Sequence, residues 1–485
     1  MRTALPTRCM SSGSPLARNG RWIAVALAVA ACCLAHPDDA LAHASERGHV
    51  LLLPTGYYIL GGAAAVAASF LGLLVLPANT LDRLAALRLQ LGHPPERLGI
   101  WTSLLGFGLF IMLVLAGFHG SRDPLSNPLP LTVWTLVWVG VTLLQGIVGD
   151  LWRWVDPWYA PVRLATRLFG GPFARLPVHF GYWPAVVGLA AFAWFELIYP
   201  APEDPAILAI VVLVYWLATF ALMLIFGHES WSRSGEFLTV FFRLISRFAI
   251  IGTSDKDGSL QICWPGARLS TAAQVPVGAV VFLLLALSSV SFDGLSKTFF
   301  WLGLNGINPL EFPGRTALVT VNTAGLALTF AGLATVFFAA VFIGERLVAS
   351  VEPFHRAAGL LVWSIVPIAL AYHLSHYLLA LVVDGQYALF ALSDPFAVGW
   401  NLLGTANFEV QAAIATGSDP AWVIWNVQAA IIILGHILAV VVAHGLAFRL
   451  HADARKAVTS QIPLTLLMIG YTVFGLWLLA SPTAG

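Results

Sequence analysis

Ten apolar segments, each close to the length that crosses a lipid bilayer, constrain this chain more than any other feature. A membrane-spanning helix requires about 20 predominantly apolar residues. The predicted spans are residues 51–77, 100–119, 131–149, 182–200, 206–227, 275–291, 316–344, 354–383, 421–448 and 462–480. Only 10% of the residues are charged, whereas about a quarter is usual in a soluble protein. The sequence therefore predicts an all-α protein, a polytopic transmembrane bundle of about ten helices.

The first 42 residues are typical of a cleaved signal peptide rather than of the bundle. Arginines precede a short apolar run at residues 22–35, and the small residues Ala40 and Ala42 follow it at the spacing of a cleavage site. Cleavage after residue 42 leaves His43 at the mature N-terminus. Residues 43–485 then form a single transmembrane domain.

Two details of this N-terminal segment stay open. Translation starts at Met1 or at Met10, and Cys32 is an alternative site of lipoprotein processing. Three of the four cysteines lie in the segment, so cleavage leaves only Cys263. One cysteine provides neither an internal disulfide nor a thiolate metal site.

Positive charges alternate between the loops in the way that sets membrane orientation. With residue 43 outside, the inner loops hold 17 arginines and lysines and the outer segments hold 4. Because cytoplasmic loops carry the excess of Lys and Arg, we expect a bacterial inner-membrane protein with both termini in the periplasm. The net charge of +1 provides no general attraction for nucleic acid.

Segments between the spans carry further predictions. The apolar periodicity of residues 236–250 predicts a helix in the membrane interface, and Asp257 and Gly258 predict the turn of a small hairpin. The outer loops 292–315 and 384–420 are long enough to be binding elements. We expect these two loops to fold back over the bundle.

Histidines inside the predicted spans are the strongest candidates for a site. His373 and His376 lie three residues apart, on one face of a helix, and His436 lies at a similar depth in the next span. Ionisable groups within a bilayer are costly and usually mark a function. Neutral imidazole binds Zn²⁺ and Cu²⁺, so we predict a zinc or copper ion held by these side chains in the outer half of the bundle. The alternative is that each histidine is a hydrogen-bonded core residue.

Further groups on the same side complete the predicted site. We predict two additional metal ligands. They are His43, at the mature N-terminus, and His119, at the end of the second span. Glu196 and Asp384 are the predicted catalytic carboxylates, acting as a base or as partners of the ligands. The sequence contains no phosphate-binding loop, nucleophile elbow or His-Glu-x-x-His helix, so the prediction rests on histidines and carboxylates.

Several stretches of the mature chain resemble one bacterial membrane family. They are HASERGHVLLLPTGYY at 43–58, LGLNGINPLEFPGR at 302–315 and AYHLSHYL at 371–378, followed by SDPF at 393–396 and GWN at 399–401. In these stretches the chain is similar to the family known as fenitrothion hydrolases. The resemblance implies an aryldialkylphosphatase-type enzyme that hydrolyses an organophosphate triester to a nitrophenol and a dialkyl thiophosphate.

The residues and the resemblance together predict a membrane-bound, metal-dependent hydrolase of organophosphate triesters. A bound metal lowers the pKa of its water and polarises the phosphoryl group, and the expected partners are the lipid bilayer and a small apolar substrate. One alternative is a copper-handling protein or transporter in which the same histidines bind a metal ion. Another is an assembly partner of a periplasmic redox system. The sequence has no His-x-His pair, which is the ligand motif of soluble amidohydrolase-type phosphotriesterases.

Overall fold

A computed structural model describes most of the chain after the predicted signal peptide. The described residues are 55–75, 79–93, 98–254, 258–311, 314–405, 408–411, 414 and 418–483. The predicted signal peptide and His43 lie outside them. Within them, nine helices are long and apolar enough to cross a membrane, and the strands are few and short. The prediction of an all-α polytopic helix bundle is confirmed.

Each predicted span corresponds to one helix or to consecutive helical pieces. The single helices are α2 (Thr55–Leu73), α4 (Leu98–His119), α9 (Trp183–Leu197), α10 (Pro205–Phe226), α14 (Val277–Ser296), α16 (Arg315–Leu347), α19 (Ser418–Leu450) and α20 (Ala454–Ala480). The third span joins α5 (Pro128–Pro130), the π-helix η1 (Leu131–Val141) and α6 (Thr142–Ile147). The eighth joins α17 (Phe354–Leu361), η5 (Val362–Ser364) and α18 (Ile365–Ser393). Helix α9 has 15 residues and a length of about 22 Å, less than the roughly 30 Å of a hydrocarbon core.

Short elements connect the spans. They are α3 (Asn79–Ala86), β1 (Arg88–Gly92), α7 (Trp152–Val155), α8 (Tyr159–Phe169), η2 (Val178–Phe180), α11 (His228–Ser234), α12 (Phe237–Ile245), η3 (Ser246–Phe248), β2 (Ile251–Thr253), β3 (Leu260–Cys263), α13 (Ala267–Ser270), α15 (Phe299–Leu304) and η4 (Pro309–Glu311).

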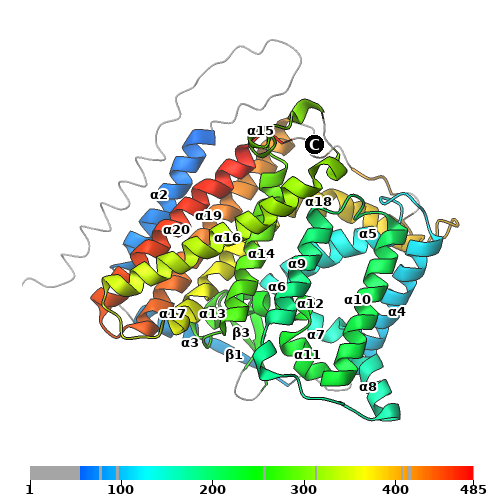
Figure 1. Cartoon of the computed structure of the whole chain (residues 1–485), viewed down its shortest axis with the longest axis horizontal. Helices are drawn as coiled ribbons and strands as arrows, with labels where there is room; N and C mark the ends of the chain where they lie inside the picture. Colours follow the sequence, from blue (N-terminus) through cyan, green and yellow to red (C-terminus); the bar gives the residue numbers. More distant parts are fainter. Residues whose placement is uncertain are drawn as a thin grey trace, which may run out of the picture.

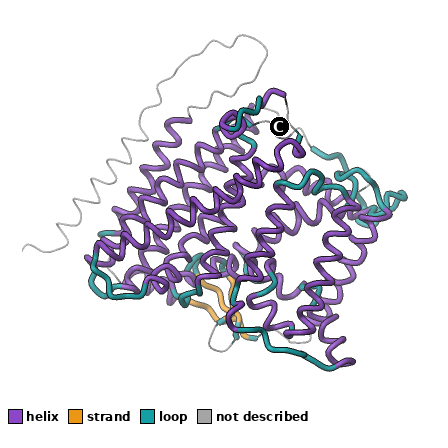
Figure 2. The backbone as a smooth tube through the Cα atoms, viewed as in Figure 1, coloured by secondary structure: helices purple, strands orange, loops and turns teal. Residues whose placement is uncertain are grey.

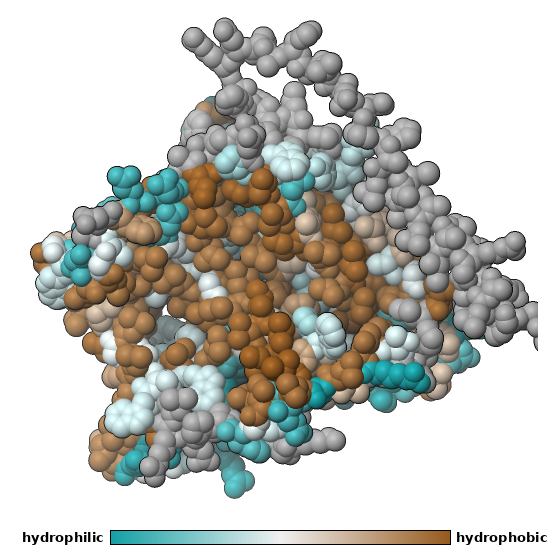
Figure 3. All heavy atoms as spheres, turned by 180° about the vertical axis from the view of Figure 1, so that it is seen from behind, coloured by the Kyte–Doolittle hydropathy of each residue, from teal (hydrophilic) through white to brown (hydrophobic). Residues whose placement is uncertain are grey.

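Burial separates two central spans from the helices around them. Other parts of the protein bury 83% of the apolar span of α14 and 94% of that of α17–α18, but only 22 to 28% of α2, α4, α10 and α16. Figure 1 shows α14 and α18 between α2, α16, α19 and α20 on one side and α4, α9 and α10 on the other. Apolar side chains cover most of the middle of the face in Figure 3, and polar ones gather toward its edges. A surface of this kind suits lipid, and the chain is a multi-pass membrane protein.

The connecting elements gather at two ends of the bundle. The end that carries α3, α8, α11, α13 and α17 holds the arginine-rich loops, and we call it the basic end. The opposite end carries α5, α15 and the C-terminus (Figure 1). The loops that the charge count groups together are therefore grouped in space.

A three-stranded antiparallel sheet, ordered β1–β3–β2, lies at the basic end (Figure 2). Strands β2 and β3 pair as a hairpin, which confirms the hairpin predicted at Gly258. Strand β1 was not predicted, since its partner β3 lies far along the chain, with Arg88 opposite Cys263. A five-residue strand that depends on a distant partner leaves little trace in the local sequence.

The two outer segments that were predicted as loops begin as helices. Helix α14 continues to Ser296 and α18 continues to Ser393, so the prediction of loops from 292 and from 384 is wrong at those positions. In α14 the charge of Asp293 is compensated one turn later by Lys297, whose Nζ lies 2.7 Å from Asp293 Oδ1. This i,i+4 pair stabilises the helix beyond its most apolar part.

The helix predicted within residues 236–250 forms as α12. Its apolar residues Phe237, Val240 and Phe241 are buried, and α12 packs against α9 and α6. Its apolar face therefore contacts the bundle.

Candidate functional site

Asp293 of α14 and His376 of α18 form the centre of a cluster of ionisable groups on the two most buried spans. His376 Nε2 lies 2.7 Å from Asp293 Oδ2. The Asp293 side chain is 5% exposed, whereas those of His376 and Lys297 are 26% and 50% exposed. Because an ionised carboxylate only accepts hydrogen bonds, it places the imidazole hydrogen on Nε2. The pair links a buried carboxylate to groups that water can reach.

Tyr377 connects this pair to a second carboxylate, Glu196 of α9. Its hydroxyl oxygen lies 3.0 Å from Asp293 Oδ2 and 3.1 Å from Glu196 Oε1. A hydroxyl has one hydrogen, so Tyr377 donates to one carboxylate at a time. Arg315 donates to the backbone carbonyl of Glu196 across 2.7 Å, which ties the end of α9 to the start of α16. We call Glu196, Asp293, Lys297, His376 and Tyr377 the ionisable cluster.

His373 lies beside the ionisable cluster but is bound elsewhere. Its Nε2 donates to the carbonyl of Trp138 in the π-helix η1, across 2.7 Å. The same carbonyl accepts from Thr142 Oγ1 across 2.5 Å. His373 Nδ1 is buried and has no hydrogen-bond partner among the described residues. The imidazole packs edge-on against Trp138 and Tyr377, with ring centroids 5.1 and 4.9 Å apart.

His436 of α19 is fully buried in a separate polar pocket. Its Nδ1 donates to the Ile432 carbonyl across 2.8 Å, and its Nε2 has no partner within the described part of the chain. The rings of Tyr372 and Tyr471 lie beside it, with centroids 6.0 and 6.3 Å away. Tyr372 in turn donates to the Tyr471 carbonyl across 2.8 Å.

The other residues predicted for the site lie apart from the cluster. His119 is exposed at the end of α4, where its ring packs against Phe118. Asp384 is half-buried in α18 close to Glu203, about 10 Å further along the helix than Tyr377. His43 lies outside the described residues. Of the two predicted catalytic carboxylates, the structure places Glu196 alone in the cluster.

The predicted metal ligands do not surround a common point in this arrangement. Among the residues that the structure describes, no group of three or more His, Cys, Asp and Glu side chains is arranged to hold a metal ion. His373 and His376 each direct Nε2 at a different protein acceptor, and His436 lies beside the tyrosine pair. As arranged, these side chains do not fit a shared three-histidine site.

A cavity of about 620 Å³ lies beside the cluster, and we call it the apolar chamber. Residues of α4, η1, α9 and α10 line most of it, among them Leu109, Leu113, Val133, Val137, Trp138, Phe192, Phe195, Val212 and Trp216. Its size lies within the range of small-molecule sites, which are mostly apolar. The apolar chamber is therefore suited to an apolar ligand taken from the bilayer.

Trp138 forms the wall between the apolar chamber and the ionisable cluster. It lines the chamber, and its ring packs against Phe192 and His373 with centroid distances of 4.6 and 5.1 Å. Helix α9 makes a second connection, since it carries Phe192 and Phe195 on the chamber and Glu196 in the cluster. An apolar molecule in the chamber would thus lie one side chain away from the ionisable groups.

One lining residue of the chamber, Tyr215, donates to the buried Glu236. Glu236 also accepts from the backbone N–H groups of Leu238 and Thr239 and so caps α12. Burial raises the pKa of the Glu236 carboxyl, although these hydrogen bonds oppose the change. This carboxyl is therefore easier to protonate than an exposed glutamate.

Two other histidine–carboxylate pairs lie at the basic end. His451 Nε2 lies 3.1 Å from Glu345 Oε1, and these side chains are only 6% and 9% exposed. His228 Nε2 lies 2.7 Å from Asp156 Oδ2. Neither pair was predicted to form a site.

Three members of the cluster were missed in the sequence. Asp293 and Lys297 fell beyond the predicted end of their span, and Tyr377 was not among the predicted site residues. The signal available was the i,i+4 spacing of an acidic and a basic residue within an apolar run. Because Asp293 and Lys297 neutralise each other's charge, the helix can continue past them. The predicted end of the span at residue 291 was therefore too early.

Comparison of the chain with known proteins gives no match. No protein-family model matches it, no curated protein is significantly similar to it, and no solved structure matches it. The function is therefore inferred from the residues and their geometry.

Proposed function

We propose that the protein is a membrane-embedded hydrolase of apolar aryl phosphotriesters in which His376 is the general base. The observation that carries the proposal is the His376–Asp293 pair, with 2.7 Å between Nε2 and Oδ2. Asp293 keeps the imidazole hydrogen on Nε2, and Nδ1 makes no hydrogen bond with the described residues. The His376 side chain is 26% exposed, and its Nδ1 can accept a proton from water, the role of an imidazole that a carboxylate orients.

The substrate class is supported by the apolar chamber and by the resemblance to fenitrothion hydrolases. An aryl phosphotriester has no charge and partitions into lipid, so it suits a chamber of about 620 Å³ lined by aliphatic and aromatic side chains. The chamber would hold the aryl group, with Trp138 between it and the cluster. Because Trp138 separates the two, its side chain would rotate aside to let the phosphorus reach His376.

In the proposed reaction, water attacks phosphorus while its proton passes to His376 Nδ1. The bond between phosphorus and the aryl oxygen breaks, and its electron pair leaves with the phenolate. The products are the dialkyl thiophosphate and the phenol, once His376 returns its proton. Tyr377 and Lys297 both bind Asp293 beside the base, and the Tyr377 hydroxyl is the donor that would stabilise the negative charge developing on the substrate.

The zinc or copper ion predicted from the sequence stays a prediction. His373, His376 and His436 each direct one ring nitrogen at a different protein acceptor, so the reaction is written with the chain's own residues. Metal analysis of the purified protein tests the ion separately. If a chelator removes bound metal and abolishes phenol release at the same time, the base would be a metal-bound water rather than His376.

The proposed location is the bacterial inner membrane. The charge rule would put the basic end in the cytoplasm and the ionisable cluster in the periplasmic half of the bundle. Both termini would then be periplasmic after removal of residues 1–42. Cysteine labelling of Ser121→Cys and Arg455→Cys variants in intact cells tests this, and we expect an impermeant thiol reagent to label the first alone.

The activity is tested with the purified full-length protein in lipid nanodiscs, by following nitrophenol release from fenitrothion. We expect turnover by the wild type and a loss of about 100-fold or more in His376→Gln, since general bases contribute roughly 10²–10⁴-fold. The matched control is His451→Gln, which removes a histidine of the same pair type at the other end of the bundle. Absence of nitrophenol release from well-folded wild type would refute the proposal, and so would equal rates in His376→Gln and wild type.

A second candidate, a metal-handling protein or transporter, is favoured by a different observation. His373 and His436 are buried, and each has one ring nitrogen without a hydrogen-bond partner among the described residues. Unpaired nitrogens of this kind are costly, and a bound metal ion would pair them. Copper or zinc retained by the wild type but not by His373→Ala or His436→Ala, without phenol release, would favour this candidate.

A further inference from the structure

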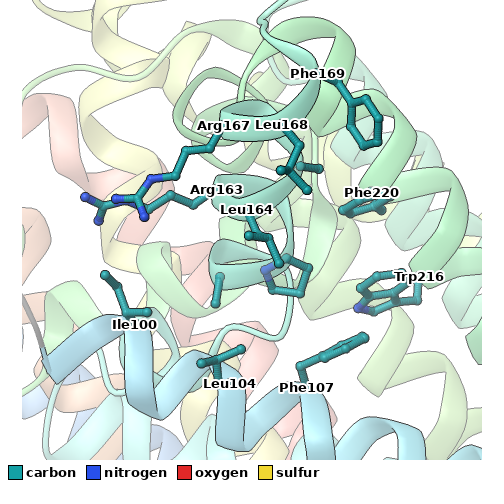
Figure 4. A pocket seen from close by; sticks show the side chains of 13 residues that line it. Ile100, Leu104, Phe107, Arg163, Leu164, Arg167, Leu168, Phe169, Trp216 and Phe220 are labelled. Atoms are coloured by element: carbon teal, nitrogen blue, oxygen red, sulfur yellow. The ribbon is translucent and has the colours of Figure 1, made fainter.

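Helix α8 presents two arginines and several apolar side chains to its surroundings at the basic end. Arg163 and Arg167 lie one helical turn apart and are exposed, as are Leu164, Leu168 and Phe169. A short helix with this composition is typical of the boundary between lipid headgroups and acyl chains. Figure 4 shows the two arginine side chains extending from α8 in the same direction, with the apolar side chains around the cavity beside them.

A cavity of about 440 Å³ lies between α4, α8 and α10, and we call it the arginine groove. It is lined by Ile100, Leu104 and Phe107 of α4, by α8, and by Trp216 and Phe220 of α10 (Figure 4). Phe107 and Trp216 lie about 14 and 15 Å from the basic ends of their helices. This depth corresponds to half of a hydrocarbon core about 30 Å thick, so the arginine groove reaches from the headgroup level to the middle of the bilayer.

The charges of the arginine groove are not neutralised by the protein. Arg163 donates to the hydroxyl of Tyr159 across 2.7 Å, and no carboxylate belongs to the lining residues. Within the described part of the chain, neither Arg163 nor Arg167 forms an ion pair. Guanidinium groups bind phosphate oxygens in a forked, charge-assisted geometry.

We infer that the arginine groove binds one anionic phospholipid of the leaflet at the basic end. Its phosphate would lie between Arg163 and Arg167, and one acyl chain would lie along Leu104, Phe107 and Trp216. Basic pockets between spanning helices bind anionic headgroups in this way. The site is separate from the ionisable cluster, which lies at the opposite end, and the inference does not depend on the proposed hydrolysis.

The test uses the full-length protein, purified in detergent and stripped of lipid, titrated with phosphatidylglycerol or with phosphatidylcholine of the same acyl chains. Native mass spectrometry counts bound lipid, and thermal unfolding gives the stabilisation. We expect one tightly bound phosphatidylglycerol and a clear preference over phosphatidylcholine. In Arg163→Gln/Arg167→Gln, we expect phosphatidylglycerol affinity to fall about 30-fold, because each basic residue near an anionic surface contributes a factor of roughly five.

The matched control is Arg346→Gln/Arg455→Gln, which removes the same charge from exposed positions of α16 and α20. We expect it to bind phosphatidylglycerol as the wild type does, and Ala165→Phe, which fills the arginine groove without a change of charge, to lose the lipid. Equal losses in both arginine variants would overturn the inference in favour of general attraction to a basic surface. Equal stabilisation of the wild type by inorganic phosphate would overturn it in favour of a simple anion site, and full lipid binding by Ala165→Phe would overturn the role of the groove.

Discussion

The two ends of the bundle contain the same pair of residue types in different surroundings. At the end opposite the basic end, Asp293 binds His376, Lys297 and Tyr377, and the His376 side chain is 26% exposed. At the basic end, His451 and Glu345 are both nearly fully buried, and Glu345 Oε2 has no partner among the described residues. The difference is one of access and of further partners rather than of residue type.

These differences in access and partners decide which histidine can act as a general base. A general base must exchange protons with water or substrate, and His376, at 26% exposure, can do so where His451, at 6%, cannot. The His228–Asp156 pair is as open as His376–Asp293, with His228 24% exposed. What distinguishes Asp293 is that Lys297 and Tyr377 also bind its carboxylate. The His451–Glu345 pair joins α16 to the residue that follows α19. A closed pair of this kind contributes to the geometry of the helices and offers no route for a substrate.

The largest expected change in rate distinguishes Asp293 of the ionisable cluster from Glu345 at the basic end. Asp293→Asn keeps the shape of the side chain but removes its negative charge and replaces one acceptor oxygen with an NH2 donor, so the imidazole hydrogen is no longer held on Nε2. We expect phenol release to fall by about 10²–10⁴-fold. Glu345→Gln should change the rate per folded molecule by less than about threefold, because it lies at the other end. Steady-state rates in nanodiscs measure both, and an inactive but folded Glu345→Gln would break the comparison.

A second prediction concerns stability rather than rate. His451→Gln removes the imidazole that binds the buried Glu345, and leaving a buried polar group without its partner costs about 1–3 kcal/mol. We therefore expect a clearly lower Tm in detergent, followed by circular dichroism. A His451→Gln protein with the wild-type Tm would show that this pair has no structural role.

Tyr377→Phe tests the link between the two carboxylates of the cluster. The variant keeps the ring that packs on His373 and His376 and removes the one hydroxyl that reaches both Asp293 and Glu196. Hydrogen bonds to charged groups contribute about 1.5–3 kcal/mol, so we expect the rate to fall roughly 10- to 100-fold with a nearly unchanged Tm. Tyr372→Phe is the matched control, since its hydroxyl binds a backbone carbonyl outside the cluster. A rate equal to wild type would remove Tyr377 from the proposed mechanism.

Lys297→Gln should have the smallest effect. The lysine is half exposed, and ion pairs open to solvent contribute about 0.2–1 kcal/mol, so we expect the rate to fall no more than about fivefold. Because salt screens exposed charges, the difference from wild type should shrink at high ionic strength. A loss as large as that of Asp293→Asn would mean that Lys297 acts on the substrate directly.

The predictions from sequence succeeded where local chemistry decides and failed where a partner from elsewhere decides. The spans, the grouping of basic loops and the hairpin near Gly258 follow from patterns of neighbouring residues. The choice of His376 and Glu196 followed from their being ionisable inside apolar segments. The partner of His376, in contrast, is on another helix, and nothing near His376 in the sequence points to Asp293.

What the sequence alone determined is that this protein is folded in lipid, and where its apolar segments lie along the chain. Apolar length and loop charge are properties of single segments, and lipid selects them one segment at a time. What only the tertiary structure decided is which polar groups meet. Asp293 joined His376, His373 joined the Trp138 carbonyl, and an apolar chamber formed beside them, because helix packing brings together residues more than 80 positions apart. In lipid every buried polar group needs a partner, and packing determines which partner it finds.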